Sequence, residues 1–412
     1  MRRGDGHSDQ RLVAFITLGL VAFGLVMVYS ATSASAALGN GDPMSYLKRQ
    51  AVYAFIGVVL MIVASRFDYH RLRYLAPPFL LVALTLCVAV LVLGPAINGA
   101  RRWFVLGPAS FQPSELAKLA LCLFAAMYLA RRRAPRTIGE LVKPLGLLTA
   151  IFCGLIVVEP DLGTTITLCG MMLAILLVAG VPVRLLVVAS ILAAGVGMIA
   201  IWAEPYRRAR MFSFLDPWSD AQGSGFQIVQ ATIGIGSGGF TGAGLGEGVG
   251  KISYLPEAHT DMIFAVIGEE LGLVGSTFVI AAFAGLAIAG FRIALRCPDR
   301  FGKLLAAGIT ALVCGQAAIN LAAALGIAPL TGIPLPFVSY GGSSLVVLLA
   351  GVGVLLNIAV NGRVVESSVR DRGGRDSGAR AARARSRRRA SRARGDGDVR
   401  RVARPRRVAA RS

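Results

Sequence analysis

A long succession of apolar segments constrains the fold of this chain more than any other feature. About ten of them approach the ~20 residues that a helix needs to cross a bilayer. Their approximate ranges are 12–30, 51–65, 77–94, 114–130, 144–158, 162–180, 184–202, 262–293, 303–325 and 343–360. With 55% hydrophobic residues, the chain is too apolar for an ordinary soluble domain. We therefore predict an all-α, polytopic membrane protein with about ten transmembrane helices.

Three parts are expected along the chain. Residues 1–11 form a short cytoplasmic N-terminus, 12–361 the transmembrane domain, and 362–412 a basic cytoplasmic tail. The first apolar run is long for the hydrophobic region of a signal peptide, and many spans follow it, so we expect it to be retained. The six cysteines are scattered singly, which predicts neither a disulfide framework nor a zinc site.

The tail from Arg363 to Ser412 holds 18 Arg against 5 acids, so about 13 of the net 21 positive charges lie there. It has almost no bulky apolar residue, which predicts disorder. Beside the inner leaflet it would attract anionic membrane lipids or acidic partners. In a soluble protein this charge would suggest nucleic acid. At this location a solvated tail is favoured, and we expect no nucleic acid.

The basic loops set the orientation in the membrane. With the N-terminus in the cytoplasm, the segments that fall on the cytoplasmic side are 66–73, 131–136, the turn near Arg184, 292–303 and the tail, and all are basic. The opposite topology would place most of them outside, so we expect both termini in the cytoplasm. The outer segments are then 31–50, 95–113, 159–161, 204–261 and 326–342. Of these, 204–261 is a long extracytoplasmic loop between helices 7 and 8.

Two basic clusters lie in the outer segments, where the positive-inside bias makes them unusual. Guanidinium groups match phosphate oxygens and stay charged, so a polyanionic group such as a lipid pyrophosphate is their natural partner. The alternatives are interfacial anchoring by the indole and non-specific contact with anionic headgroups. The clusters consist of Arg101, Arg102 and Trp103, and of Arg207, Arg208 and Arg210.

Pro113 and Ser114 are typical of a helix start. Glu115 and Lys118 follow three residues apart, and therefore on one face of that helix. They form either a structural ion pair that closes the bundle or, through Lys118, a contact with phosphate. In the turn 159–161, Asp161 is expected to cap the next helix, and a role in the site is the weaker alternative.

The stretch 251–272 carries the strongest signal for a site. It places Glu257, His259 and Asp261 within five residues, directly before an apolar helix. Ionisable residues at the edge of a span are costly and usually carry function. For Asp261 taken alone, the alternative is the N-cap of that helix.

Two outer segments, 234–250 and 334–344, are rich in glycine. The first formally matches GxGxxG, but it lacks a βαβ context and predicts no dinucleotide site. Glycine here instead allows a re-entrant or closely packed backbone against a substrate. In the second segment we expect Ser339 and Ser343 to contact substrate.

Five motifs resemble, in order and spacing, those of the SEDS family of shape, elongation, division and sporulation proteins. The motifs are GARRW, QPSELAK, EPDLGT, YLPEAHTDMIFAVIGEELG and PLPFVSYGGSS. The resemblance covers about residues 12–360. YLPEAH and the preceding GAGLGEG are more similar to the cell-division (FtsW) branch than to the rod-elongation (RodA) branch.

The resemblance implies a peptidoglycan glycosyltransferase that polymerises lipid II into glycan strands at the outer face of the bacterial cytoplasmic membrane. It also implies a class B penicillin-binding protein and other division proteins as partners, and a location at the division septum. The family's essential acid aligns with Asp261. This residue is the expected general base for the acceptor hydroxyl, because a low-dielectric interface can raise a carboxylate pKa toward working pH.

The remaining candidates have more than one role open to them. Lys118 and the arginines of the two basic clusters are candidates to hold the pyrophosphate oxygens. His259 either relays a proton, orients Asp261 or structures the loop. Glu257 with Asp261 is a candidate to bind Mg²⁺ or Mn²⁺, because hard cations prefer oxygen ligands.

Two other functions remain open. A lipid II flippase suits ten helices with intramembrane charges, but a transporter should show an internal repeat and polar residues near the midplane. No convincing repeat is visible, and the polar groups gather at one face. A scaffold that recruits division partners through the tail does not explain Asp261.

Overall fold

The computed structural model describes residues 5–37, 43–97, 99–107, 109–248 and 258–362. Ten helices in these ranges are long and apolar enough to cross a membrane. They are His7–Ser33, Met44–Arg66, Tyr69–Leu93, Pro113–Arg131, Ile138–Val158, Leu162–Ala179, Val183–Ala203, Ile263–Arg296, Arg300–Ala324 and Gly342–Gly362. Each coincides with an apolar segment of the sequence, so the prediction of an all-α polytopic membrane protein is confirmed. The tail from residue 363 and Glu257 lie outside the described residues.

The helices and strands follow in this order. The first half contains α1 (Asp5–Ala37), α2 (Pro43–Arg66), the 3₁₀ turn η1 (Tyr69–Arg71), α3 (Leu72–Leu93), the antiparallel strands β1 (Phe104–Leu106) and β2 (Ala109–Phe111), α4 (Pro113–Arg131), α5 (Ile138–Leu141), η2 (Val142–Gly146) and α6 (Leu147–Val158). The second half contains α7 (Leu162–Ala179), α8 (Val183–Ala203), α9 (Pro205–Leu215), α10 (Phe226–Ser237), α11 (Ile263–Arg296) and α12 (Arg300–Ala324). The last helix is Gly342–Gly362.

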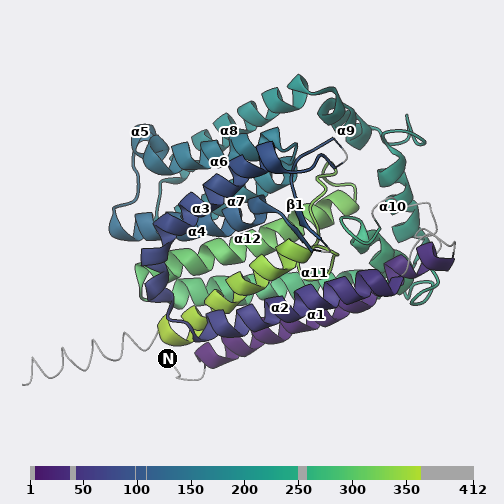
Figure 1. The fold of residues 1–412 in the computed structure, drawn as a ribbon, viewed down its shortest axis with the longest axis horizontal. Helices are drawn as coiled ribbons and strands as arrows, with labels where there is room; N and C mark the ends of the chain where they lie inside the picture. Colours follow the sequence, from purple (N-terminus) through teal and green to yellow (C-terminus); the bar gives the residue numbers. More distant parts are fainter. Residues whose placement is uncertain (1–4, 38–42, 98, 108, 249–257, 363–412) are drawn as a thin grey trace, which may run out of the picture. The chain divides into compact units, whose positions relative to one another are not determined.

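Helix α12 packs against α4, α7 and α11, and α1 packs against α2 and α11 (Figure 1). Most residues of α4, α12 and the last helix are buried. Close packing of helices in a membrane depends on small residues, and α12 is rich in Ala and Gly. By contrast α8 contacts α7 and α9 and exposes most of its apolar side chains. This exposure fits a helix that faces lipid, because lipid tails are as apolar as the side chains.

The segment between α8 and α11, predicted as a long loop, is partly helical because it contains α9 and α10. Its described glycine-rich part packs closely against α11, and its packing against a substrate stays a prediction. Ala243 N donates to the Glu269 carbonyl at 3.0 Å, and Leu273 N donates to the Gly239 carbonyl at 2.9 Å. These bonds surround Gly272, where α11 is interrupted at φ 62° and ψ −153°.

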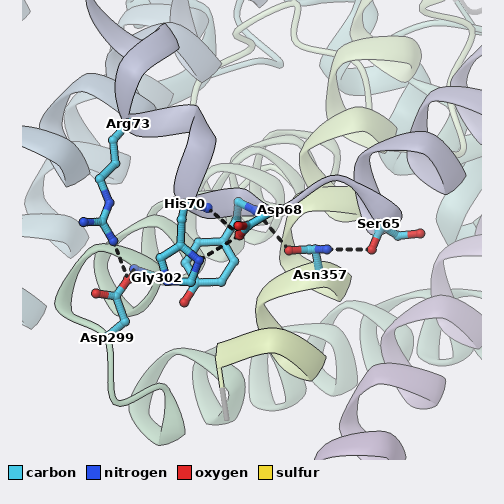
Figure 2. A network of polar contacts seen from close by, with 8 residues as sticks. Ser65, Asp68, His70, Arg73, Asp299, Gly302 and Asn357 are labelled. Atoms are coloured by element: carbon cyan, nitrogen blue, oxygen red, sulfur yellow. Dashed lines mark hydrogen bonds and ion pairs between the residues drawn. The ribbon is translucent and has the colours of Figure 1, made fainter. Parts of the chain in front are cut away.

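At one end of the bundle, polar side chains join the α2–α3 turn to the start of α12 and to the last helix (Figure 2). Asp299 caps α12 by accepting from Gly302 N at 2.9 Å, and it lies 3.5 Å from the Arg73 guanidinium. Asn357 accepts from Tyr69 N at 3.2 Å and donates to the Ser65 carbonyl at 2.7 Å. Two of the basic turns from which the orientation was predicted are therefore tied together.

Candidate functional site

Asp261 lies in the turn that leads into α11. Its side chain is half-buried, and the Thr260 hydroxyl donates to Oδ1 at 3.3 Å. Its backbone carbonyl accepts from Asn320 Nδ2 at 2.8 Å. The N-cap of α11 is Met262 rather than Asp261, so the alternative that Asp261 caps this helix is wrong. The structure thus holds the half-buried Asp261 by its backbone.

His259 packs among aromatic rings. Its ring centroid lies 5.0 Å from that of Tyr46 and 5.6 Å from that of Tyr340, and the two tyrosine rings are 5.5 Å apart. The backbone N–H of Tyr340 donates to the His259 carbonyl at 2.9 Å. Burial raises the pKa of the Tyr340 hydroxyl. His259 therefore joins the Asp261 turn to α2 and to the segment before the last helix.

The two predicted substrate-binding serines are buried and bonded to backbone groups. The Ser339 hydroxyl accepts from Leu335 N at 2.8 Å, and the Ser343 hydroxyl accepts from Gln112 N at 3.3 Å. Gln50 Nε2 donates to the Ser339 carbonyl at 3.1 Å. In the structure these serines shape the segment that passes the Asp261 turn, and their contact with substrate stays a prediction.

Glu115 and Lys118 form a buried ion pair on α4. Lys118 Nζ lies 2.9 Å from Glu115 Oε1 and also donates to Gln316 Oε1 at 2.8 Å. Lys118 is 0% exposed and Glu115 is 2% exposed. Gln316 in turn donates to the Pro334 carbonyl at 3.1 Å. The pair is thus linked through α12 to the segment that flanks Asp261.

Arg102 holds the turn between α6 and α7. Its Nε donates to the Glu159 carbonyl, and its Nη2 donates to the Pro160 carbonyl at 2.7 Å. Pro160 sits at φ 28°, a conformation that a proline ring disfavours. Asp161 accepts from Thr164 N at 2.9 Å, so its predicted role as the N-cap of α7 is confirmed.

The Glu159 side chain is 0% exposed, and neither carboxylate oxygen has a hydrogen-bond partner among the described residues. Burial, reinforced by the neighbouring Asp161 and opposed by Arg102, raises the pKa of Glu159 to about 8. The group is consequently a mostly neutral acid at pH 7, one residue beyond α6.

The other basic candidates are spread over the outer segments. Arg101 donates to the Leu91 and Val92 carbonyls at the end of α3, and Trp103 is half-buried. On α9, Arg207 donates to the Ala200 and Val157 carbonyls. Arg210 donates to the Leu330 carbonyl. The half-buried Arg208 lies between them.

A family model described as "Cell cycle protein", which carries the names FtsW, RodA and SpoVE, matches residues 10–364. The chain belongs to this family. It is 40% identical over 351 residues to "Probable peptidoglycan glycosyltransferase FtsW" of Geobacter metallireducens, a match that covers 84% of this chain and 94% of that protein. It is 39% identical over 356 residues to stage V sporulation protein E of Bacillus subtilis, covering 85% and 97%. The expected resemblance to the SEDS family and its FtsW branch is thereby confirmed.

Two solved structures share the SEDS fold with this chain. A chain of a structure described as "Structural coordination of polymerization and crosslinking by a peptidoglycan synthase complex" superposes with a TM-score of 0.71 at 38% identity. The superposition covers 84% of this chain and 96% of the other chain. The rod shape determining protein RodA of Thermus thermophilus superposes with a TM-score of 0.63 at 33% identity, covering 84% and 95%.

Four residues around the site were not singled out from the sequence: Tyr46, Gln316, Asn320 and Tyr340. The two amides carried a usable signal, because Gln316 and Asn320 stand four residues apart in an otherwise apolar helix and therefore share a face. The two tyrosines carried none, since aromatic residues are common at membrane interfaces.

Proposed function

We propose that this SEDS protein is a peptidoglycan glycosyltransferase that polymerises lipid II, with Asp261 as general base. The names of the FtsW relatives support the reaction class. The observation that carries the assignment of the base is the placement of Asp261. Its backbone is fixed by Asn320 from α12, and the residue is half-buried at the end of a span. A group fixed in this way is pre-organised for proton transfer.

The reaction joins two lipid-linked sugars. The Asp261 carboxylate accepts the proton of the acceptor's GlcNAc 4-hydroxyl, and the oxygen attacks the anomeric carbon of the donor strand. The bond from that carbon to the polyprenyl pyrophosphate breaks, and the leaving group takes the electron pair. Cationic donors that stabilise the departing phosphate lower the barrier.

We assign pyrophosphate binding to the arginines of the outer segments, of which Arg102 bonds the turn between α6 and α7. Guanidinium groups keep unused N–H donors after bonding carbonyls, because each has five. Lys118 is fully buried and both of its bonds go to protein groups, so we assign it to the ion pair with Glu115 instead.

The chain is a multi-pass membrane protein, and we place both termini in the cytoplasm and the Asp261 turn on the outer face, as the basic loops favour. The structure described as a peptidoglycan synthase complex supports a class B penicillin-binding protein as partner. We also propose that it works at the division septum beside other division proteins, which the family description "Cell cycle protein" supports.

We include a divalent cation, Mg²⁺ or Mn²⁺, in the proposal. Carboxylate oxygens such as those of Asp261 suit hard cations, which would neutralise charge on the pyrophosphate. Within the described residues, no three His, Cys, Asp or Glu side chains gather to hold a metal. Removal of divalent cations with EDTA, followed by a return of Mg²⁺ or Mn²⁺, tests this part of the proposal.

The test of the function is lipid II polymerisation by the purified full-length chain, with and without its penicillin-binding partner. Wild type should produce glycan strands, and folded Asp261→Ala and Asp261→Asn should not. Polymerisation by both variants would remove Asp261 as the base and turn attention to Glu257 and His259. If wild type makes no strands even with the partner, the polymerase proposal fails and lipid II flipping becomes the function to test.

A further inference from the structure

Helix α12 presents two buried amides on one face. Gln316 and Asn320 are 0% and 2% exposed, and their spacing of four residues places them one turn apart. A buried amide in an apolar helix is costly unless it is hydrogen-bonded. Both amides bond to the segment before the last helix, and Gln316 also links α12 to Lys118, whereas Asn320 also links it to the Asp261 turn.

Asn320 makes two bonds with one nitrogen. Its Nδ2 donates to the Asp261 carbonyl at 2.8 Å and to the Ile333 carbonyl at 2.8 Å. Because both partners are acceptors, the group between them must be the NH₂ and not the oxygen. One side chain therefore fixes the turn of the catalytic carboxylate and the segment before the last helix to the same point of α12.

The Asp261 turn and the segment before the last helix are also bonded to each other directly. This bond runs from Tyr340 N to the His259 carbonyl at 2.9 Å. Asn320 connects this pair of segments to the core, since α12 packs against α4, α7 and α11. A shift of about 1 Å in a catalytic group can lower the rate about 10²-fold. A hydrogen bond that fixes the Asp261 turn therefore affects the reaction rate.

We propose that Asn320 is a positioning residue for Asp261, holding the backbone of the general base at a fixed place on α12. This inference rests on the proposed function. Asn320 does not touch the reacting atoms; it acts through the Asp261 carbonyl. The loss of its amide donors would let the turn shift and would leave two carbonyls without their bond.

Three variants separate positioning from packing. Asn320→Ala removes the donor, and Asn320→Asp keeps the shape but turns oxygens toward two carbonyl oxygens. Leu312→Ala is the matched control, because Leu312 is also buried on α12 and its loss leaves a cavity without touching the Asp261 turn. The full-length chain with its penicillin-binding partner would be studied in lipid nanodiscs.

Two readouts are needed. Hydrogen–deuterium exchange of the peptide that spans residues 258–266 reports the turn itself, whatever the chemistry. The kinetics of lipid II polymerisation report its consequence. We expect both Asn320 variants to raise exchange in this peptide and to lower kcat about 10- to 100-fold, with KM changed less than about 2-fold. The acidic limb of their kcat–pH profile should shift, whereas Leu312→Ala should change neither the exchange of this peptide nor the pH profile.

Each outcome decides the proposal. Unchanged exchange in the Asn320 variants, or a loss of kcat that Leu312→Ala matches, overturns it. The failure of the proposed function looks different: Asp261→Asn then polymerises like wild type although the Asn320 variants raise exchange. That result would show that Asp261 is not the general base and that its hydrogen bond to Asn320 has no role in catalysis. The structural link between Asn320 and the turn would stand.

Discussion

Lys118 Nζ lies 2.9 Å from Glu115 Oε1 in a place where neither side chain is more than 3% exposed. The ammonium also donates to Gln316, so two of its three protons have partners. Two charges taken out of water interact strongly, but each is stable there only while the other is present. Breaking the pair is therefore costly even where its net contribution to stability is small, and the bond from Lys118 to Gln316 links it to α12.

The first prediction concerns this ion pair. Lys118→Met and Glu115→Gln should each destabilise the protein by about 3–5 kcal/mol, because each leaves the partner charge or its hydrogen bonds uncompensated. The double variant should cost clearly less than the sum of the two. Unfolding in detergent, arranged as a double-mutant cycle, measures the interaction free energy. Additive losses within about 0.5 kcal/mol would contradict the pairing.

The second prediction follows from Glu159, whose pKa is raised to about 8 by burial. The folded state binds the Glu159 proton more tightly than the unfolded state does. The contribution of Glu159 to the free energy of unfolding is therefore complete below the ordinary carboxyl pKa. This contribution is lost as pH rises from about 4.5 to about 8. The total change is on the order of a few kcal/mol, since each pKa unit corresponds to about 1.4 kcal/mol.

Glu159→Gln should remove this pH dependence, because an amide has the shape of the protonated acid and does not titrate. Thermal unfolding in detergent between pH 5 and pH 9 measures it. Wild type and the variant should unfold at similar temperatures near pH 5, and the variant at the higher temperature near pH 9. The exposed Glu204→Gln controls for the loss of one acidic charge. Parallel curves for wild type and Glu159→Gln would show that Glu159 is not buried as a neutral acid.

The sequence predicted the local features of this protein well. Each membrane span is one contiguous apolar run, and the Asp161 cap depends on a partner only three residues away. Hydrogen bonds between distant segments could not be predicted in the same way. Asn320 and Asp261 are 59 residues apart, and Gln316 and Lys118 are 198 apart. Such pairs are set by how the helices pack, which hydrophobic periodicity alone does not specify.

The glycine-rich segment illustrates the same limit. Its composition indicated a closely packed backbone, but not the surface against which it packs. In the structure that surface is α11, at the interruption near Gly272. The expected contact of this segment with a substrate stays a prediction. Composition reports the conformational freedom of a segment, whereas the partner is a property of the tertiary fold.

The third prediction compares neighbouring arginines. Arg102→Ala should lower stability by about 1–3 kcal/mol, because it leaves the Glu159 and Pro160 carbonyls without their charged donor. Arg102→Lys should recover little, since a lysine lacks the planar fork that reaches two acceptors. Arg101→Ala is the matched control; its exposed guanidinium bonds carbonyls at 3.1 and 3.4 Å, and its loss should cost about 0.5 kcal/mol or less. Denaturant unfolding ranks the three, and equal losses at both positions would reject a special role for Arg102.

The fourth prediction tests the packing of the glycine-rich segment on α11. Gly242 has φ 81°, and a Cβ there would lie 2.1 Å from the Glu270 carbonyl oxygen. Gly242→Ala should therefore force the segment off α11 and break the bonds that Ala243 and Gly244 donate to it at 3.0 Å. We expect destabilisation of more than about 2 kcal/mol, the sum of left-handed strain and lost hydrogen bonds.

Gly236→Ala provides the control, because Gly236 lies in α10 with nothing within 4 Å of an added Cβ. Alanine favours a helix over glycine by up to about 1 kcal/mol, so this variant should be as stable as wild type or more so. Thermal unfolding and limited proteolysis between α10 and α11 report the two variants side by side. If Gly242→Ala is as stable as Gly236→Ala and no more sensitive to protease, the segment does not depend on contact with α11. A specific loss at Gly242 would show that the interrupted helix α11 and the glycine-rich segment form one packed unit.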